Sequence, residues 1–234
     1  MTQVNEWGVD LHPKQLALFR RYAELLADYT EANVIGTRDA SKIILDHVLD
    51  SLSCLLLQNT GFQGKLIDVG AGGGLPGIPL GVVRPDLNVT LLEATKKKAK
   101  FLGLSQERLG LTNVKVMNQR AEVAGQQAGL RDSYDIAVSR ALASLPVVIE
   151  YCAPFVQEGG SVLAMKGPLE EEEIVSGKRA ATKLGSEFSH VLEIPFNNRL
   201  EQKQRQIVVF RKVAATPTGY PRRIGLAKKR PIGV

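Results

Sequence analysis

Residues 66–80 read LIDVGAGGGLPGIPL, and this stretch decides how the rest of the chain is interpreted. Four of the five residues from position 70 to position 74 are glycine, and prolines follow at positions 76 and 79. Glycine is entropically costly inside regular structure, so this cluster predicts a turn whose backbone is closely approached by something else. The apolar run KLIDV before it is typical of a short strand, and Pro76 suits the first turn of a following helix. The stretch predicts a strand, a glycine-rich turn and a helix.

Strands and helices are predicted to alternate from Lys65 onward. Alternation of this kind is typical of a mostly parallel sheet covered on both faces, and two closing strands without a long helix between them indicate an antiparallel edge. We therefore expect a Rossmann-like α/β fold with a seven-stranded sheet. The predicted strands are 65–69, 89–93, 114–118, 134–139, 160–167, 190–196 and 205–212, and the predicted helices after the turn include 96–109, 121–129, 145–156 and 171–184.

The first 60 residues have a different pattern. Apolar residues recur at helical intervals from Leu16 to Leu26, and Asp39 or Ser41 can cap a second helix. The organisation we expect is an N-terminal helical extension at 1–60, the α/β domain at 61–213 and a basic C-terminal tail at 214–234.

Composition excludes several classes of protein. No stretch of about 18 consecutive apolar residues is present, and the first residues lack the order of a signal peptide, so we expect neither a membrane span nor secretion. Cys54 and Cys152 lie far apart, which is typical of a reduced, cytoplasmic protein. The histidines His12, His47 and His190 are scattered, so no metal site is expected. We expect a cytoplasmic protein that is a monomer.

Positive charge is concentrated at the end of the chain. The formal net charge is +6, and the stretch from Arg211 to Val234 has seven basic residues and no acidic residue. Basic ends of this kind often contact phosphate backbones, but a solvated, partly disordered tail is an equal alternative.

The glycine-rich turn and an acidic residue further on indicate a nucleoside ligand. Ligands of open α/β sheets lie beyond the carboxyl ends of the strands. Without side chains at Gly70, Gly72 and Gly74, a ligand can lie directly on the backbone. Asp68 can accept a hydrogen bond from a cationic amine, and Glu93, at the end of the next strand, can accept from both hydroxyls of a ribose.

The spacing of the glycines separates the nucleoside classes. A dinucleotide site requires G-x-G-x-x-G, but Leu75 stands where its third glycine should be, and no Gly-Lys-Ser/Thr of a P-loop follows. The observed G-x-G-x-G resembles that of S-adenosylmethionine-dependent methyltransferases. Two alternatives from other classes are a nicotinamide-dependent oxidoreductase and a non-catalytic RNA-binding protein that has lost its cofactor.

Longer motifs give a closer resemblance. They are HVLDSL (47–52), DVGAGGGLPGIPL (68–80), RPDLNVTLLEATKKKAKFL (84–102), RAE (120–122), SRALA (139–143), AMKGP (164–168) and YPRRIG (220–225). Together they resemble the small-subunit ribosomal RNA methyltransferase G family, also called glucose-inhibited division protein B, over about residues 15–232. The resemblance implies a class I methyltransferase that uses S-adenosylmethionine to methylate the N7 atom of a guanine in 16S rRNA. Methylation of another RNA is the alternative within this class.

The resemblance also implies roles for individual residues. Gly70, Leu75 and the segment Glu93–Ala94–Thr95 are expected to contact the cofactor, and Ala121 and Glu122 to flank its adenine. Arg140 is expected to pair with the cofactor carboxylate or with an RNA phosphate. Its alternative is a structural ion pair with Asp135 or Glu150.

Chemistry on guanine N7 requires few reactive groups. This atom has an in-plane lone pair and no proton, so alignment and exclusion of water suffice. Lys166 and Arg140 are the candidate catalytic residues, with Lys166 donating to guanine O6 or a phosphate; otherwise Lys166 is a solvated strand end. His47 either covers the cofactor or pairs with Asp50 within its helix. The candidate contacts to 16S rRNA are Arg120, Lys166, Arg205, Arg222 and Arg223.

Overall fold

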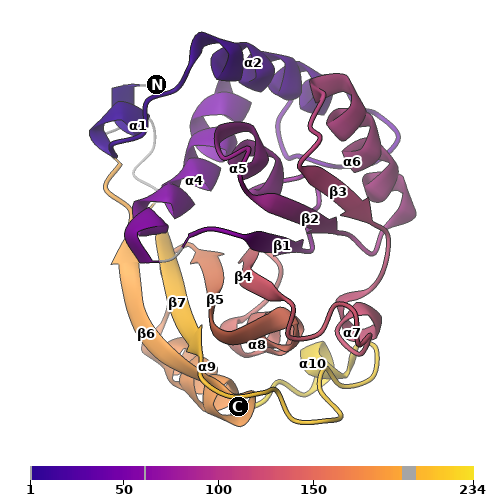
Figure 1. Ribbon diagram of the computed structural model, residues 1–234, viewed down its shortest axis with the longest axis vertical. Helices are drawn as coiled ribbons and strands as arrows, with labels where there is room; N and C mark the ends of the chain where they lie inside the picture. Colours follow the sequence, from indigo (N-terminus) through magenta and orange to yellow (C-terminus); the bar gives the residue numbers. More distant parts are fainter. Residues whose placement is uncertain (1, 61, 197–203) are drawn as a thin grey trace.

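The computed structural model describes residues 2–60, 62–196 and 204–234. A seven-stranded sheet of order β3-β2-β1-β4-β5-β7-β6 forms its centre (Figure 1). Strands β1 to β5 are parallel, and β7 lies antiparallel between β5 and β6, which confirms the predicted sheet and its antiparallel edge. The strands are β1 (Lys65–Val69), β2 (Asn88–Leu92), β3 (Val114–Met117), β4 (Tyr134–Arg140), β5 (Val156–Lys166), β6 (Ser186–Glu193) and β7 (Gln206–Lys212).

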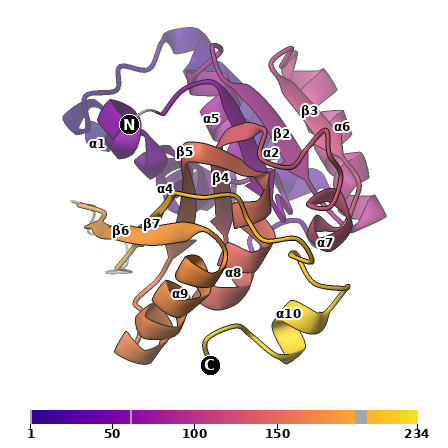
Figure 2. The same cartoon turned by 60° about the horizontal axis from the view of Figure 1, so that its bottom comes forward.

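Helices cover both faces of the sheet because successive strand residues point to opposite sides. In β1, Leu66 belongs to one hydrophobic core and Ile67 to the other. The first core is completed by α1 (Thr2–Glu6), α2 (Pro13–Asp28), α4 (Leu49–Leu52), α5 (Gly77–Val83) and α6 (Lys96–Leu109). The second is completed by α7 (Ala121–Ala124), α8 (Leu145–Cys152), α9 (Glu171–Lys183) and α10 (Leu226–Lys229), as Figures 1 and 2 show.

The N-terminal helices are part of the first core. Asp39 caps α3 (Ala40–Lys42) by accepting from the backbone N–H groups of Ser41 and Lys42 at 2.9 and 3.2 Å. A short π-helical stretch, η1 (Ile43–Val48), continues α3 into α4, and 3-10 turns follow in η2 (Ser53–Thr60). Phe19 and Leu26 of α2 are fully buried in the same core as the strand residues, so the helical extension has no separate core.

Some element bounds differ from the prediction. The predicted helix 145–156 ends at Cys152, because the 3-10 turn η3 (Ala153–Phe155) leads into β5, which begins at Val156. Pro76 is the residue before α5 rather than in its first turn. The predicted strand 190–196 begins at Ser186 and ends at Glu193, close before Pro195, which has no N–H for the ladder.

The basic C-terminal tail is folded against the domain. Its residues Ala227 and Ile232 are buried in the second core, and α10 lies beside α7 and α8 in both views (Figures 1 and 2). The described tail residues therefore pack against the domain, whereas the side chains of Arg223, Lys228, Lys229 and Arg230 are exposed to solvent. None of the described helices is long and apolar enough to cross a membrane.

Candidate active site

Two cavities lie near the carboxyl ends of the parallel strands. The first has a volume of about 150 Å³ and is bounded by residues that follow β1, β2, β3 and β4 and by two residues of the C-terminal segment. Its lining is Val69, Gly70, Leu92, Ala94, Gln119, Arg120, Ala121, Glu122, Leu142, Tyr151, Gly225 and Lys228. Gly70, Ala94, Ala121 and Glu122, four of the predicted cofactor residues, are thus brought together. We call it the cofactor cavity, after the cofactor contacts that the sequence predicts for these residues.

The glycine-rich turn has the backbone that its sequence predicts. Gly70, Gly72 and Gly74 have φ angles of 76°, 58° and 90°, a region that side chains disfavour. A Cβ atom at Gly70 would lie 2.6 Å from Cδ1 of Leu142. Because glycine has no Cβ, Leu142, in the turn after β4, can pack against Gly70 and close the cavity on this side. Gly73 instead admits the carbonyl oxygen of Val34, from the N-terminal segment. The protein's own atoms therefore account for part of the cluster.

Two carboxylates lie behind this turn. Glu93 accepts from the N–H of Gly72 at 2.9 Å and from the N–H of Thr95 at 2.7 Å, one bond to each oxygen. It therefore joins the turn after β1 to the turn after β2. Asp68 is fully buried and accepts from the N–H of Gly77 at 2.8 Å through Oδ2, whereas its Oδ1 has no hydrogen-bond partner among the described residues. Burial raises the pKa of the Asp68 carboxyl to about 7, although the Gly77 N–H and the charge of Arg140 oppose the rise.

The remaining cofactor candidates have separate positions. Glu122 is buried and accepts from the hydroxyl of Tyr151 and the N–H of Gly225, at 3.1 and 3.0 Å. Thr95 is the exposed residue before α6, and Leu75 is buried in the first core; neither lines the cofactor cavity. Their contacts with a cofactor stay predictions.

The second cavity, of about 300 Å³, collects the candidate catalytic residues. It is lined by His47, Asp50, Arg140, Ala141, Met165, Lys166, Gly167 and Arg205. We call it the substrate cavity, after the RNA contacts that the sequence predicts for Lys166 and Arg205. Arg140 donates to Asp50 at 3.1 Å and Arg205 lies 3.8 Å from the same carboxylate. Burial raises the pKa of Asp50 and the two guanidinium groups oppose that rise. Ala141, with a φ of 51°, is one of two non-glycine residues with positive φ among those described.

The structure corrects two alternatives from the sequence. Arg140 pairs with Asp50, not with Asp135 or Glu150, because Asp135 accepts from Lys65 N–H and Gln157, and Glu150 pairs with Arg222. Lys166 is no solvated strand end: its side chain is 14% exposed and donates to the Ala143 carbonyl at 2.6 Å and to Glu173 at 2.8 Å. The Asp50 carboxylate accepts from Arg140, and its expected pairing with His47 stays a prediction.

The candidate RNA contacts divide in two groups. Arg120 at the mouth of the cofactor cavity and Arg223 are exposed, and Arg205 borders the substrate cavity. Arg222 is different, because its guanidinium forms a two-pronged ion pair with the buried carboxylate of Glu150.

Sequence reasoning missed Asp50, Glu173, Tyr151, Gly225 and Lys228 as parts of these sites. Glu173 is seven residues from Lys166, but the others are far along the chain from the residues that they contact, and no local spacing indicates such contacts. No cluster of metal-binding side chains occurs in the described ranges, and both cysteines are buried free thiols whose pKa is raised by burial.

Solved structures share this fold. The structure resembles a MtNAS mutant in complex with S-adenosylmethionine (TM-score 0.56, 16% identity, 85% of this chain and 73% of that one). It also resembles the antibiotic-resistance methyltransferase Kmr (TM-score 0.54, 14% identity, 68% of this chain and 92% of that one). This is the Rossmann-like fold of S-adenosylmethionine-dependent methyltransferases.

Sequence relatives narrow the class to one family. Residues 15–214 match the family model described as rRNA small subunit methyltransferase G. The ribosomal RNA small subunit methyltransferase G of Rubrobacter xylanophilus is 47% identical over 98% of this chain and 88% of its own length. That of Acetivibrio thermocellus is 40% identical over 97% and 92%. The chain belongs to the rRNA small subunit methyltransferase G family, as its motifs predicted.

Proposed function

We propose that this protein transfers a methyl group from S-adenosylmethionine to the N7 atom of a guanine in 16S rRNA, acting as a cytoplasmic monomer. Membership of the family supports small-subunit rRNA as the substrate. The observation that carries the cofactor assignment is the pair of carboxylates, Asp68 and Glu93, that bind the glycine-rich turn from Gly72 to Gly77; Gly70 of this turn lines the cofactor cavity, whereas the two carboxylates lie outside its lining.

The residues present fit an adenosyl sulfonium. The unpartnered Oδ1 of buried Asp68 is an acceptor suited to a cationic amine, and unpaired buried acceptors are costly unless a ligand satisfies them. Each oxygen of Glu93 accepts one backbone N–H and retains capacity for a ribose hydroxyl. Ala121 and Glu122 would flank the adenine.

Methyl transfer to guanine N7 requires the protein mainly to position the two reactants. S-adenosylmethionine, when bound, supplies a methyl group activated by a positively charged sulfur. Guanine N7 is unprotonated, so no general base is needed, and the protein must align the two reactants and exclude water. Cys54 and Cys152 line neither cavity, which argues against a cysteine nucleophile such as pyrimidine C5 methylation requires.

The substrate cavity provides the positive charge that an RNA base and its phosphate require. Arg140, Lys166 and Arg205 border it, and their partners Asp50 and Glu173 hold the first two side chains in place. Lys166 is proposed to donate to guanine O6 or to a nearby phosphate. Arg120 and Arg223 are proposed to contact the RNA backbone outside the cavity.

Lys166→Ala is expected to lower kcat for methylation of rRNA by about 10- to 100-fold, the size of one lost charged contact in the transition state. The Kd for S-adenosylmethionine should stay within about twofold, because Lys166 does not line the cofactor cavity. Single-turnover assays and calorimetry measure the two quantities. Lys115→Ala, an exposed lysine in β3, is the matched control. Unchanged turnover of the Lys166 variant would remove its catalytic role.

The function itself is tested with small ribosomal subunits from a strain in which the gene is deleted. Purified protein and S-adenosylmethionine labelled in the methyl group should place label on one guanine. Because N7 methylation leaves the base positively charged, borohydride and aniline should cleave the RNA there. Label on another base, or only on another RNA, would overturn the substrate assignment. Stabilisation by NAD alone in a thermal-shift assay would favour the oxidoreductase.

A further inference from the structure

The C-terminal segment forms one wall of the cofactor cavity. Gly225 and Lys228 line it together with residues that follow the parallel strands. The N–H of Gly225 donates to Oε1 of Glu122 at 3.0 Å, and the hydroxyl of Tyr151 donates to the same oxygen at 3.1 Å. A carboxylate whose one oxygen receives two donors has a fixed orientation. The segment therefore helps to fix a side chain of the cavity.

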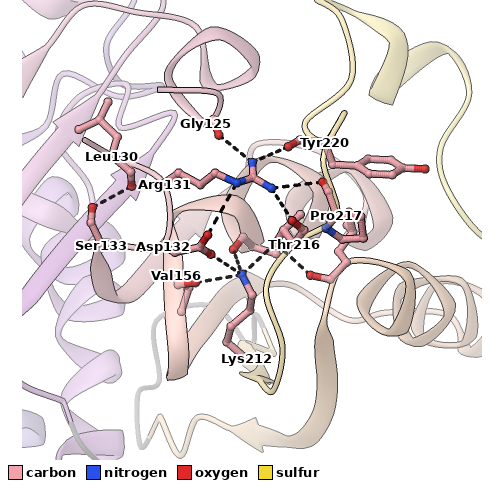
Figure 3. A network of polar contacts seen from close by, with 12 residues as sticks. Gly125, Leu130, Arg131, Asp132, Ser133, Val156, Lys212, Thr216, Pro217 and Tyr220 are labelled. Atoms are coloured by element: carbon pink, nitrogen blue, oxygen red, sulfur yellow. Dashed lines mark hydrogen bonds and ion pairs between the residues drawn. The ribbon is translucent and has the colours of Figure 1, made fainter. Parts of the chain in front are cut away.

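Two basic residues secure the beginning of this segment (Figure 3). Arg131 donates to the carbonyl oxygens of Gly125, Tyr220, Thr216 and Pro217. Lys212, whose side chain is fully buried, donates to Asp132 at 3.1 Å and to the hydroxyl of Thr216 at 2.8 Å. Lys212 also donates to the carbonyl oxygens of Ala153 and Val156. These contacts hold residues 216–220 at the domain surface.

Arg222 secures the part of the segment that reaches the cavity. Its Nε and one terminal nitrogen donate to the two oxygens of Glu150 at 2.9 and 2.6 Å, and its backbone N–H donates to the same carboxylate at 2.9 Å. The terminal nitrogen also donates to the carbonyl of Arg230 at 2.8 Å, which closes the loop that contains Gly225 and Lys228. The Glu150 side chain, on α8, is 1% exposed. An arginine that binds both oxygens of a carboxylate is held in one orientation and also neutralises its charge.

We propose that the C-terminal segment, residues 214–234, is a structural part of the cofactor site, and that Arg222 is the residue that positions it. By holding Gly225 against Glu122, Arg222 completes the wall beside the adenine of S-adenosylmethionine. Arg222 acts through Glu122 and the backbone and has no contact with the reacting atoms. The inference rests on the proposed function only in the identity of the cofactor.

Arg222→Ala and Arg223→Ala form a matched pair, because each removes one arginine from the same motif and only Arg222 pairs with Glu150. Calorimetric titration with S-adenosylmethionine should show at least about tenfold weaker binding for Arg222→Ala, and less than about twofold for Arg223→Ala. A variant that had only lost stability would bind fewer moles of cofactor at unchanged Kd. Without cofactor, amide exchange should accelerate at residues 222–230 in Arg222→Ala alone.

A folded Arg222→Ala variant that binds the cofactor within twofold of the wild-type protein would overturn the inference. If that variant does not fold, Lys228→Ala against Lys229→Ala tests the wall directly, with weaker binding expected for the first only. Wild-type protein that binds S-adenosylmethionine but methylates no rRNA would contradict the proposed function and leave this inference standing. Wild-type protein that does not bind S-adenosylmethionine would overturn both.

Discussion

Glu93→Ala is expected to weaken the binding of S-adenosylmethionine by roughly 100-fold or more. The carboxylate is proposed to accept from the ribose hydroxyls, and it accepts the N–H groups of Gly72 and Thr95 in this structure. Hydrogen bonds to a charged group are each worth about 1.5–3 kcal/mol, so the loss of two exceeds the roughly 2.7 kcal/mol of a 100-fold change. Removing the side chain also releases the glycine-rich turn from the turn after β2. Isothermal titration calorimetry measures the change in Kd.

Two further variants separate the contribution of the Glu93 charge from that of its hydrogen bonds. Glu93→Gln retains one carbonyl oxygen but no charge, so its affinity should lie between those of the wild-type protein and the alanine variant. Glu107→Ala, at an exposed position in the last turn of α6, controls for the loss of a negative charge away from the glycine-rich turn. An affinity of Glu93→Ala within about threefold of the wild-type value would refute the assignment of this carboxylate to the ribose.

Asp68→Asn is expected to remove a pH dependence from the stability of the protein. The pKa of the buried Asp68 carboxyl is raised from 3.8 to about 7. Between these values the folded state keeps a proton that the unfolded state has released, so the free energy of unfolding falls as the pH rises. The full effect is roughly 4 kcal/mol at 1.36 kcal/mol per pKa unit, complete above about pH 7. Asparagine keeps an oxygen for the Gly77 N–H and has no charge to bury.

Denaturant titrations at pH 5 and pH 8 measure this difference. Between the two pH values the variant should gain roughly 3 kcal/mol relative to the wild-type protein, because about two pKa units of the linkage lie above pH 5. Asp86→Asn is the control, because the hydrogen bond from Arg84 lowers the pKa of Asp86 and keeps it ionised at both pH values. An equal change in the free energy of unfolding between pH 5 and pH 8 for Asp68→Asn and the wild-type protein would contradict the prediction. The affinity for cationic S-adenosylmethionine should rise through pH 7 in the wild-type protein only.

Local patterns in the sequence were sufficient to predict the strands of the sheet and the glycine-rich turn. Strand positions follow from short apolar runs, and the place of Glu93 follows from its position at the end of the second run. The interpretation of the glycines was incomplete, because the sequence indicates a close approach to the backbone without identifying what approaches. At Gly73 the approaching group is the Val34 carbonyl, nearly 40 residues earlier in the chain.

Pairs of distant residues could not be predicted. Arg140 and Asp50 are 90 residues apart, and Arg222 and Glu150 are 72 residues apart, so neither pair produces a periodic or spaced signal. Basic composition suggested contacts with solvent or RNA for residues 214–234. The structure places part of that charge in internal contacts, because buried carboxylates such as Glu150 require a partner.

The position of β7 between β5 and β6 determines the order in which the sheet can be completed. β7 follows both neighbours in the chain, so a nascent polypeptide that has not reached Gln206 has an unpaired β5 edge along Val162–Met165. Such edges are templates for association with other chains. Insertion of a strand between two others requires contacts of long sequence separation, which are slow to form. The edge of β5 is therefore open to association with other chains until β7 has paired with it.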